Sequence, residues 1–249
     1  MERSGVVAIL RDRVDVPWID AAWIGGSDAF GRADARSDVD LSVLVDPDRG
    51  DDAFALVEAA LAEVGGIDAV YRVPEPTWHG HRQAFYQLRG LPESAMVDLC
   101  VMRADRLAPF LDPVRHGRPI VWFDRVGAVV PTPDETLGAT FRTRLATLRD
   151  RTRLLAHLPA KAAARGRIAE AADLYQRLLL APLVEVLRAR HDPHRQDFGF
   201  RYLPEDLPPD LVARIDALSV PGGPDALVIA IDEVRAWLEA ELDASPVGQ

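Results

Sequence analysis

Two carboxylates in strand spacing, Asp38 and Asp40, follow a glycine-serine turn, Gly25-Gly26-Ser27, by about a dozen residues. The glycines let the backbone approach a polyphosphate because no Cβ stands in the way, and Ser27 adds a hydroxyl donor. Two neighbouring carboxylates repel each other unless a cation lies between them, and Mg²⁺ is usually bound by one or two carboxylates together with substrate phosphates. The segment therefore predicts metal-dependent phosphate chemistry.

Two strands must bring the turn and the carboxylates together. The apolar segment 21–25 is typical of a strand that leads into the turn, and 39–45 is typical of a second strand. Because side chains alternate along a strand, Asp38 and Asp40 should share one face while the intervening valine enters the other.

A third acid lies inside an apolar run further along the chain. Asp98 is the lone charged residue of the segment 94–102. A charge in a buried strand is costly unless it is paired or bound to a metal, so this carboxylate needs a partner. The runs 83–89 and 95–102 are separated by a turn and predict a hairpin that would bring Asp98 to the middle of the sheet.

The glycine-serine turn and the run Ser37-Asp38-Val39-Asp40-Leu41 resemble the signature of the DNA polymerase β superfamily of nucleotidyltransferases. Within it they are similar to the small-molecule branch, which includes aminoglycoside and lincosamide nucleotidyltransferases. The resemblance implies a third carboxylate on a neighbouring strand, and Asp98 matches that position, as a metal ligand or as the base that takes the proton from the acceptor hydroxyl. It also implies two Mg²⁺ ions and an NTP as co-substrate.

The expected site has two groups of residues. The predicted catalytic and metal-binding residues are Asp38, Asp40 and Asp98. The predicted nucleotide-binding residues are Gly25, Gly26, Ser27, Arg36 and Ser37. Asp28 is interpreted as loop surface, and whether Arg32 or Arg36 contacts a phosphate or is only solvated is left open.

Composition narrows the class of partner. The chain has 249 residues, with 29 Lys plus Arg against 39 Asp plus Glu and a formal net charge of −10. Nucleic-acid-binding domains present basic patches, so this balance disfavours a nucleic-acid acceptor.

The chain has one cysteine, lacks a long apolar run, and begins with a short apolar segment next to acidic residues, unlike a secretory signal. We expect a cytoplasmic enzyme with no membrane association; the sequence does not distinguish a monomer from a homodimer.

The expected fold class is α+β in two domains. Residues 1–128 alternate strand and helix patterns and predict a mixed-sheet domain, with a last edge strand near 119–123. Residues 129–249 predict a helical bundle. Its expected helices span about 133–158, 160–190 with breaks at Gly166 and Pro182, 208–219 and 222–242. The resemblance implies that the first is the nucleotidyltransferase catalytic domain and the second the substrate-binding domain.

The resulting hypothesis is a nucleotidyltransferase that moves a nucleoside monophosphate from an NTP to a hydroxyl of a small molecule, antibiotic-like or a metabolite, and releases pyrophosphate. The alternative is a protein-directed nucleotidyltransferase that modifies a toxin or regulatory partner, and a third possibility is a silent nucleotide-binding module.

The roles of several other residues are left open by the sequence. Arg195, Arg201 and Tyr202 belong to a loop that either contacts the substrates or is purely structural. The histidine pairs His79/His81 and His191/His194 lack helical zinc-ligand spacing and are expected to be loop residues. Trp78 is interpreted as core or hairpin packing.

Overall fold

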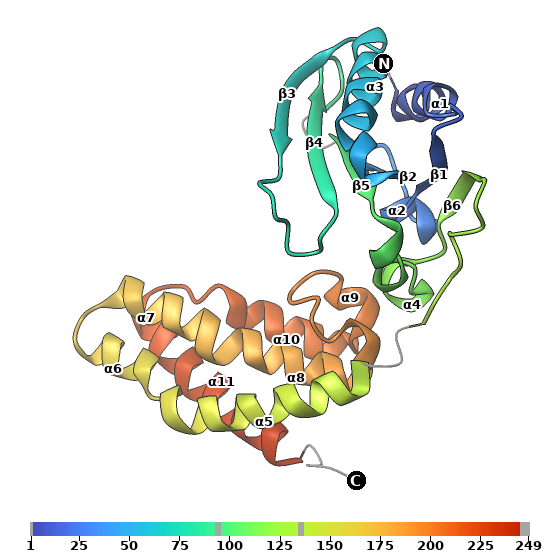
Figure 1. Ribbon diagram of the computed structural model, residues 1–249. Helices are drawn as coiled ribbons and strands as arrows, with labels where there is room; N and C mark the ends of the chain where they lie inside the picture. The colour runs from blue at the N-terminus through green and yellow to red at the C-terminus, as the bar shows by residue number, and fades with distance from the viewer. Residues whose placement is uncertain (1, 93–95, 134–136, 245–249) are drawn as a thin grey trace. The chain divides into compact units, whose positions relative to one another are not determined.

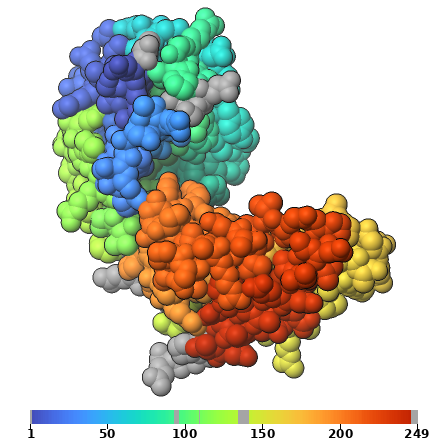
Figure 2. All heavy atoms as spheres, turned by 180° about the vertical axis from the view of Figure 1, so that it is seen from behind, coloured from blue at the N-terminus to red at the C-terminus, as the bar shows by residue number. Residues whose placement is uncertain are grey.

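The chain forms two compact units, Met1–Asp134 and Glu135–Gln249. The computed structural model describes residues 2–92, 96–133 and 137–244. In Figure 2 the first unit is coloured blue to green and the second yellow to red. Within the described ranges, no helix combines the length and apolar character needed to cross a membrane.

The first unit is built on a six-stranded mixed sheet in the order β3-β4-β5-β2-β1-β6. Its strands are β1 (Ile19–Ile24), β2 (Val39–Val45), β3 (Ile67–Arg72), β4 (Arg82–Leu88), β5 (Met96–Met102) and β6 (Ile120–Asp124). Its helices are α1 (Arg3–Arg13), α2 (Gly26–Ala29), α3 (Gly50–Glu63) and α4 (Pro113–His116). The strand pair β2–β5 is parallel, and the other neighbouring pairs are antiparallel.

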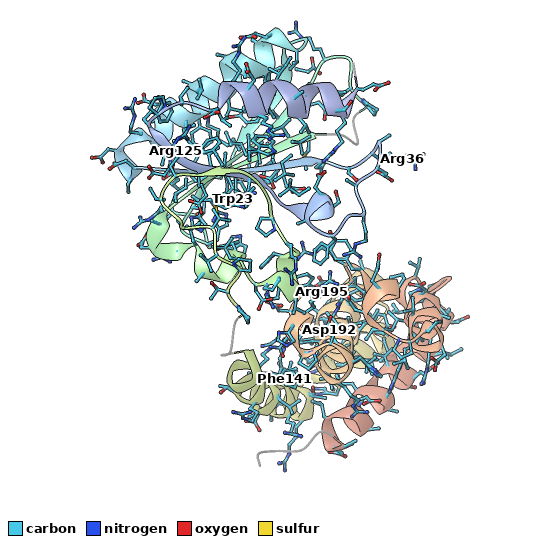
Figure 3. The ribbon with its side chains drawn as sticks, turned by 90° about the vertical axis from the view of Figure 1, so that its right-hand side faces the viewer. Trp23, Arg36, Arg125, Phe141, Asp192 and Arg195 are labelled. Atoms are coloured by element: carbon cyan, nitrogen blue, oxygen red, sulfur yellow. The ribbon has the colours of Figure 1, made fainter. Side chains whose placement is uncertain are left out.

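The alternation of side chains gives the sheet two different faces. One face is apolar and packs under α1 and α3, which lie side by side in Figure 1, through residues such as Val39, Leu41 and Leu99. The other face carries Asp40 and Asp98, because these residues alternate with the apolar ones along β2 and β5. At one end of this second face, Trp23 (Figure 3) belongs to a smaller apolar cluster.

The structure confirms the strands expected around the site. The hairpin prediction is correct, because β4 and β5 pair antiparallel, and β5 lies next to β2 as expected. The last strand, β6, is an edge strand of the sheet, also as expected. The fold is therefore α+β with a mixed sheet.

The second unit is helical. It contains α5 (Leu137–Leu155), α6 (Leu158–Ala164), α7 (Ile168–Tyr175), α8 (Ala181–His191), α9 (Leu203–Asp206), α10 (Pro209–Ser219) and α11 (Pro224–Ala244). Helix α8 contacts both α5 and α11, and most of its residues are buried (Figure 1). The expected start of the first helix at Pro133 adjoins residues 134–136, which lie outside the described part of the chain.

The break expected at Pro182 takes a different form. A π-helical turn, Gln176–Leu180, joins α7 to α8, and Pro182 lies in the first turn of α8. A proline there loses little, because the first N–H groups of a helix have no intrahelical partner. The break at Gly166 is present, with this glycine at φ +72° between α6 and α7.

Candidate active site

Asp40 and Asp98 are direct neighbours across the parallel pair β2–β5, where the register places them opposite each other. Both are half-buried. Burial raises the pKa of Asp40 to about 6, with further contributions from the negative charges of Asp38 and Asp28, while Arg3 lowers it. Burial also raises the pKa of Asp98 to about 6, and the charges of Asp40 and Asp38 add to this. Burial therefore opposes the ionisation of both carboxylates, and the charge of Asp40 also opposes that of Asp98.

The glycine turn lies directly against one of these carboxylates. Gly26 has φ +53°, and a Cβ on it would lie 1.9 Å from Oδ2 of Asp40. The N–H of Gly25 donates to the carbonyl oxygen of Asp40 at 2.9 Å, which fixes the turn against β2. Only glycine fits at position 26, because both the backbone angle and the space exclude a side chain. The turn and the acid pair, separated in sequence, thus form one site.

Ser27 carries a hydroxyl whose hydrogen-bonding capacity is unused. Its Oγ is buried, and no other group in the described residues hydrogen-bonds to it. A buried hydroxyl without a partner is costly, so such a group calls for an explanation. A ligand oxygen at the turn would supply the missing partner.

Asp38 lies just before β2 and is turned toward the neighbouring strand. Its Oδ1 accepts a hydrogen bond from the backbone N–H of Met96 at 3.0 Å. Its charge still contributes to the raised pKa values of Asp40 and Asp98. Across the described residues, no three or more His, Cys, Asp and Glu side chains converge as a ready metal-binding group. The structure thus brings Asp40 and Asp98 together directly and Asp38 only within electrostatic reach.

Arg3, which the sequence analysis missed, connects the turn to the start of β2. Its guanidinium donates to the carbonyl oxygens of Ser37 and Asp38, with Nη2 2.8 Å from the latter, and forms an ion pair with the carboxylate of Asp28. The interpretation of Asp28 as loop surface is therefore wrong, since its side chain is only 14% exposed. No sequence pattern near the turn indicates this role, because Arg3 lies in a separate helix, α1.

Arg36 and Ser37 show less connection to the site. The loop 31–36 is exposed and lies on the surface in Figure 2, with Arg36 at the outer side of its unit in Figure 3. The hydroxyl of Ser37 bonds within the loop, because it accepts from the N–H of Asp34 and donates to that residue's carboxylate. The structure therefore places Gly25 and Gly26 against Asp40, with Ser27 next in the turn, whereas Arg36 and Ser37 belong to the loop that precedes β2.

Gln83, which sequence reasoning also missed, touches Asp98. Its Nε2 lies 2.8 Å from Oδ1 and 3.0 Å from Oδ2 of that carboxylate, and the bond counteracts the rise in the pKa of Asp98. His79 lies on the other side of the Gln83 amide, with Nε2 3.2 Å from Oε1. The alternation of side chains along β4 indicates which face of the sheet Gln83 occupies. Only the register of β4 against β5 shows that this side chain reaches Asp98.

Trp78 is 89% exposed, so its interpretation as a packing residue is wrong.

Neither a protein-family model nor a curated protein matches this sequence. The chemistry that the site can perform follows from its ligand atoms. Asp38, Asp40 and Asp98 offer only oxygen ligands, which suit a hard divalent cation such as Mg²⁺. A cation there would stabilise the charged form of both carboxylates, which burial and the neighbouring negative charges disfavour. The Ser27 hydroxyl together with the glycine surface suits a phosphate oxygen. The residues present therefore fit a divalent ion and a polyphosphate.

In the second unit, the loop after α8 is held by a buried charge network. Asp206 forms ion pairs with both Arg188 and Arg195, and Nε of Arg188 donates to the carbonyl oxygen of Gly199 at 2.7 Å. Arg195 (Figure 3) is only 5% exposed. These contacts give Arg195 a structural role within its own unit. By contrast, Tyr202 is 48% exposed at φ 59°, and Arg201 is exposed.

Proposed function

We propose that the chain is a Mg²⁺-dependent nucleotidyltransferase that transfers a nucleoside monophosphate from an NTP to a hydroxyl of a small molecule. The observation that carries the proposal is the in-register pair Asp40–Asp98 beside a glycine turn that holds a buried, unpartnered serine hydroxyl. Each part alone is common in proteins. Their combination supports phosphate transfer because it offers an anion-binding turn next to acids that need a cation.

Each residue has a defined part in this reaction. The Gly25–Gly26 backbone and the Ser27 hydroxyl bind the β- and γ-phosphates of the NTP. Asp40 and Asp98 would hold the metal, with the nearby charge of Asp38 adding to the attraction for it. The metal would supply charge neutralisation at the phosphates when it is bound. Arg3 keeps the turn and the start of β2 in fixed relation through Asp28 and the carbonyl oxygens of Ser37 and Asp38.

The bond changes follow from transfer at the α-phosphorus. The acceptor oxygen forms a bond to that phosphorus, and the bond from it to the bridging oxygen of the pyrophosphate breaks. Asp98 takes the proton of the acceptor hydroxyl. The products are a nucleoside monophosphate ester and pyrophosphate.

The proposal is tested by mass spectrometry. The full chain is incubated with Mg²⁺, each of the four common NTPs, and a panel of aminoglycosides, lincosamides and hydroxylated metabolites. The expected result is an acceptor heavier by one nucleoside monophosphate, together with released pyrophosphate. A labelled protein in place of a labelled small molecule would favour the protein-directed alternative, and NTP binding without pyrophosphate release would favour a silent binding module.

A further inference from the structure

A chain of hydrogen bonds leads from the loop before β4 to Asp98. Gln83 on β4 pairs in register with Cys100 on β5, which places its side chain on the same face as Asp98 and diagonal to it. Its Nε2 contacts both oxygens of the carboxylate, at 2.8 and 3.0 Å. The amide therefore meets the carboxylate with its donor end.

The orientation of that amide is set by His79. The Nδ1 of His79 accepts the backbone N–H of His81 at 3.1 Å, so the hydrogen of the neutral ring is on Nε2. This Nε2–H donates to Oε1 of Gln83 at 3.2 Å. Because the oxygen of the amide is occupied by a donor, its NH₂ group is left for Asp98.

The loop that holds His79 is itself fixed. His81 is 1% exposed; its Nδ1 accepts the N–H of Arg103 at 3.0 Å and its Nε2 donates to the carbonyl oxygen of Arg106 at 3.2 Å. The hydroxyl of Thr77 donates to the carbonyl oxygen of His81 and closes the turn. The loop is therefore tied to the segment that directly follows β5, the strand that carries Asp98.

A second glutamine on the same strand provides an internal comparison. Gln87 lies on the same face of β4, and its Nε2 donates to the carbonyl oxygen of Pro92 at 3.2 Å. Gln87 thus contributes to a loop contact, whereas Gln83 contacts the acid. If the Gln83 side chain contributed only to the stability of β4, substitution of Gln83 and of Gln87 would have the same effect on metal binding.

We propose that Gln83 and His79 are positioning residues for Asp98, with His79 fixing the amide of Gln83 and Gln83 fixing the carboxylate for metal binding and proton transfer. The inference builds on the proposed function of the same site. Partners behind metal ligands orient the ligand oxygens, and losing one typically lowers metal affinity or activity about 10- to 100-fold.

The test is Mn²⁺ binding to the full chain, measured by electron paramagnetic resonance at fixed pH. Gln83→Met removes the amide at nearly constant volume, and His79→Leu removes the donor that orients it. Both should lower Mn²⁺ affinity by about 10-fold. His79→Gln should restore most of the affinity, because its amide nitrogen is as many bonds from Cβ as the ring Nε2 is. Gln87→Met, the matched control, should bind as the wild type does.

A second measurement works without metal. The NMR signals of the Gln83 side-chain amide should shift in His79→Leu, return toward the wild-type position in His79→Gln, and stay unchanged in Gln87→Met. If Gln83→Met does not fold, as judged by circular dichroism, the two His79 variants decide the question.

The possible failures are distinct. If Gln83→Met or His79→Leu binds Mn²⁺ as tightly as the wild type does, the positioning role is wrong and the proposed function still stands. A folded wild-type chain that binds no Mn²⁺ would overturn the proposed function, and the inference with it.

Discussion

Asp40 and Asp98 lie opposite each other on the parallel strands β2 and β5, although 58 positions of sequence separate the two acids. The same β2 residue, Asp40, also lies against the backbone of Gly26, so a single side chain joins the acid pair to the turn. The steric and electrostatic properties of the site follow from these two contacts.

Replacing Gly26 should damage the site through steric overlap. In Gly26→Ala the new methyl group would overlap the Asp40 carboxylate, and we expect transfer activity to fall by about 100-fold, as when a reacting group is displaced by about 1 Å. Gly31→Ala is the control, because Gly31 also has a positive φ, +66°, but open space around it. It should lose about 1–2 kcal/mol of stability and little activity. Equal loss of activity in both variants would mean that backbone strain, not the contact with Asp40, matters.

The acid pair should make the metal-free fold less stable as the pH rises. The unfolded chain has ordinary aspartate pKa values near 4, whereas those of Asp40 and Asp98 are about 6 in the fold. Between these values the folded chain binds more protons, so its free energy of unfolding falls as the pH rises from about 4 through 6.

Urea unfolding of the wild type and of the double variant Asp40→Asn/Asp98→Asn across this pH range checks that prediction. The double variant should lose the decline and be the more stable protein at neutral pH, and added Mg²⁺ should stabilise the wild type alone. If the free energy of unfolding changes with pH in the same way in both proteins, the acid pair ionises in the fold as it does in the unfolded chain, and the prediction is wrong.

Arg3 should be needed for both stability and activity. Removing its charge-assisted bonds to Asp28 and to the carbonyl oxygen of Asp38 in Arg3→Met should cost about 2–3 kcal/mol, measured by urea unfolding, and should reduce transfer. The control on the same helix is Arg13→Met, which removes an exposed ion pair with Glu63 and should cost much less stability than Arg3→Met. Similar losses in the two variants would contradict a special role for Arg3.

The second unit should depend on Asp206. In Asp206→Asn the buried guanidinium groups of Arg188 and Arg195 lose their shared counter-charge, and we expect a loss of about 3–5 kcal/mol. Asp173→Asn breaks an exposed pair with Arg177 and should be nearly neutral. Circular dichroism during urea unfolding compares them. A neutral effect of Asp206→Asn would contradict a structural role for the loop's buried charges.

Local pattern was sufficient for much of the first unit. The apolar alternation around Asp40 and Asp98 predicted both strands, and the turn between residues 89 and 95 predicted the β4–β5 hairpin. The direct register of Asp40 against Asp98 was not predictable, because it is a parallel pairing between distant segments.

The contacts around the carboxylates were hidden for a related reason. Arg3 reaches Asp28 and the start of β2 from a separate helix, and Gln83 reaches Asp98 diagonally across two strands. His79 contacts Gln83 from a loop whose geometry depends on the buried ring of His81. Each contact depends on tertiary placement, which spacing along the chain does not encode.

The most direct test of the central claim follows the label of the NTP during the reaction with an acceptor mixture and Mg²⁺. With α-labelled NTP the label should appear on the acceptor, with γ-labelled NTP it should appear in pyrophosphate, and Asp40→Asn should abolish both while keeping its circular dichroism spectrum. Transfer of the γ-label to the acceptor, or undiminished turnover by Asp40→Asn, would contradict the account.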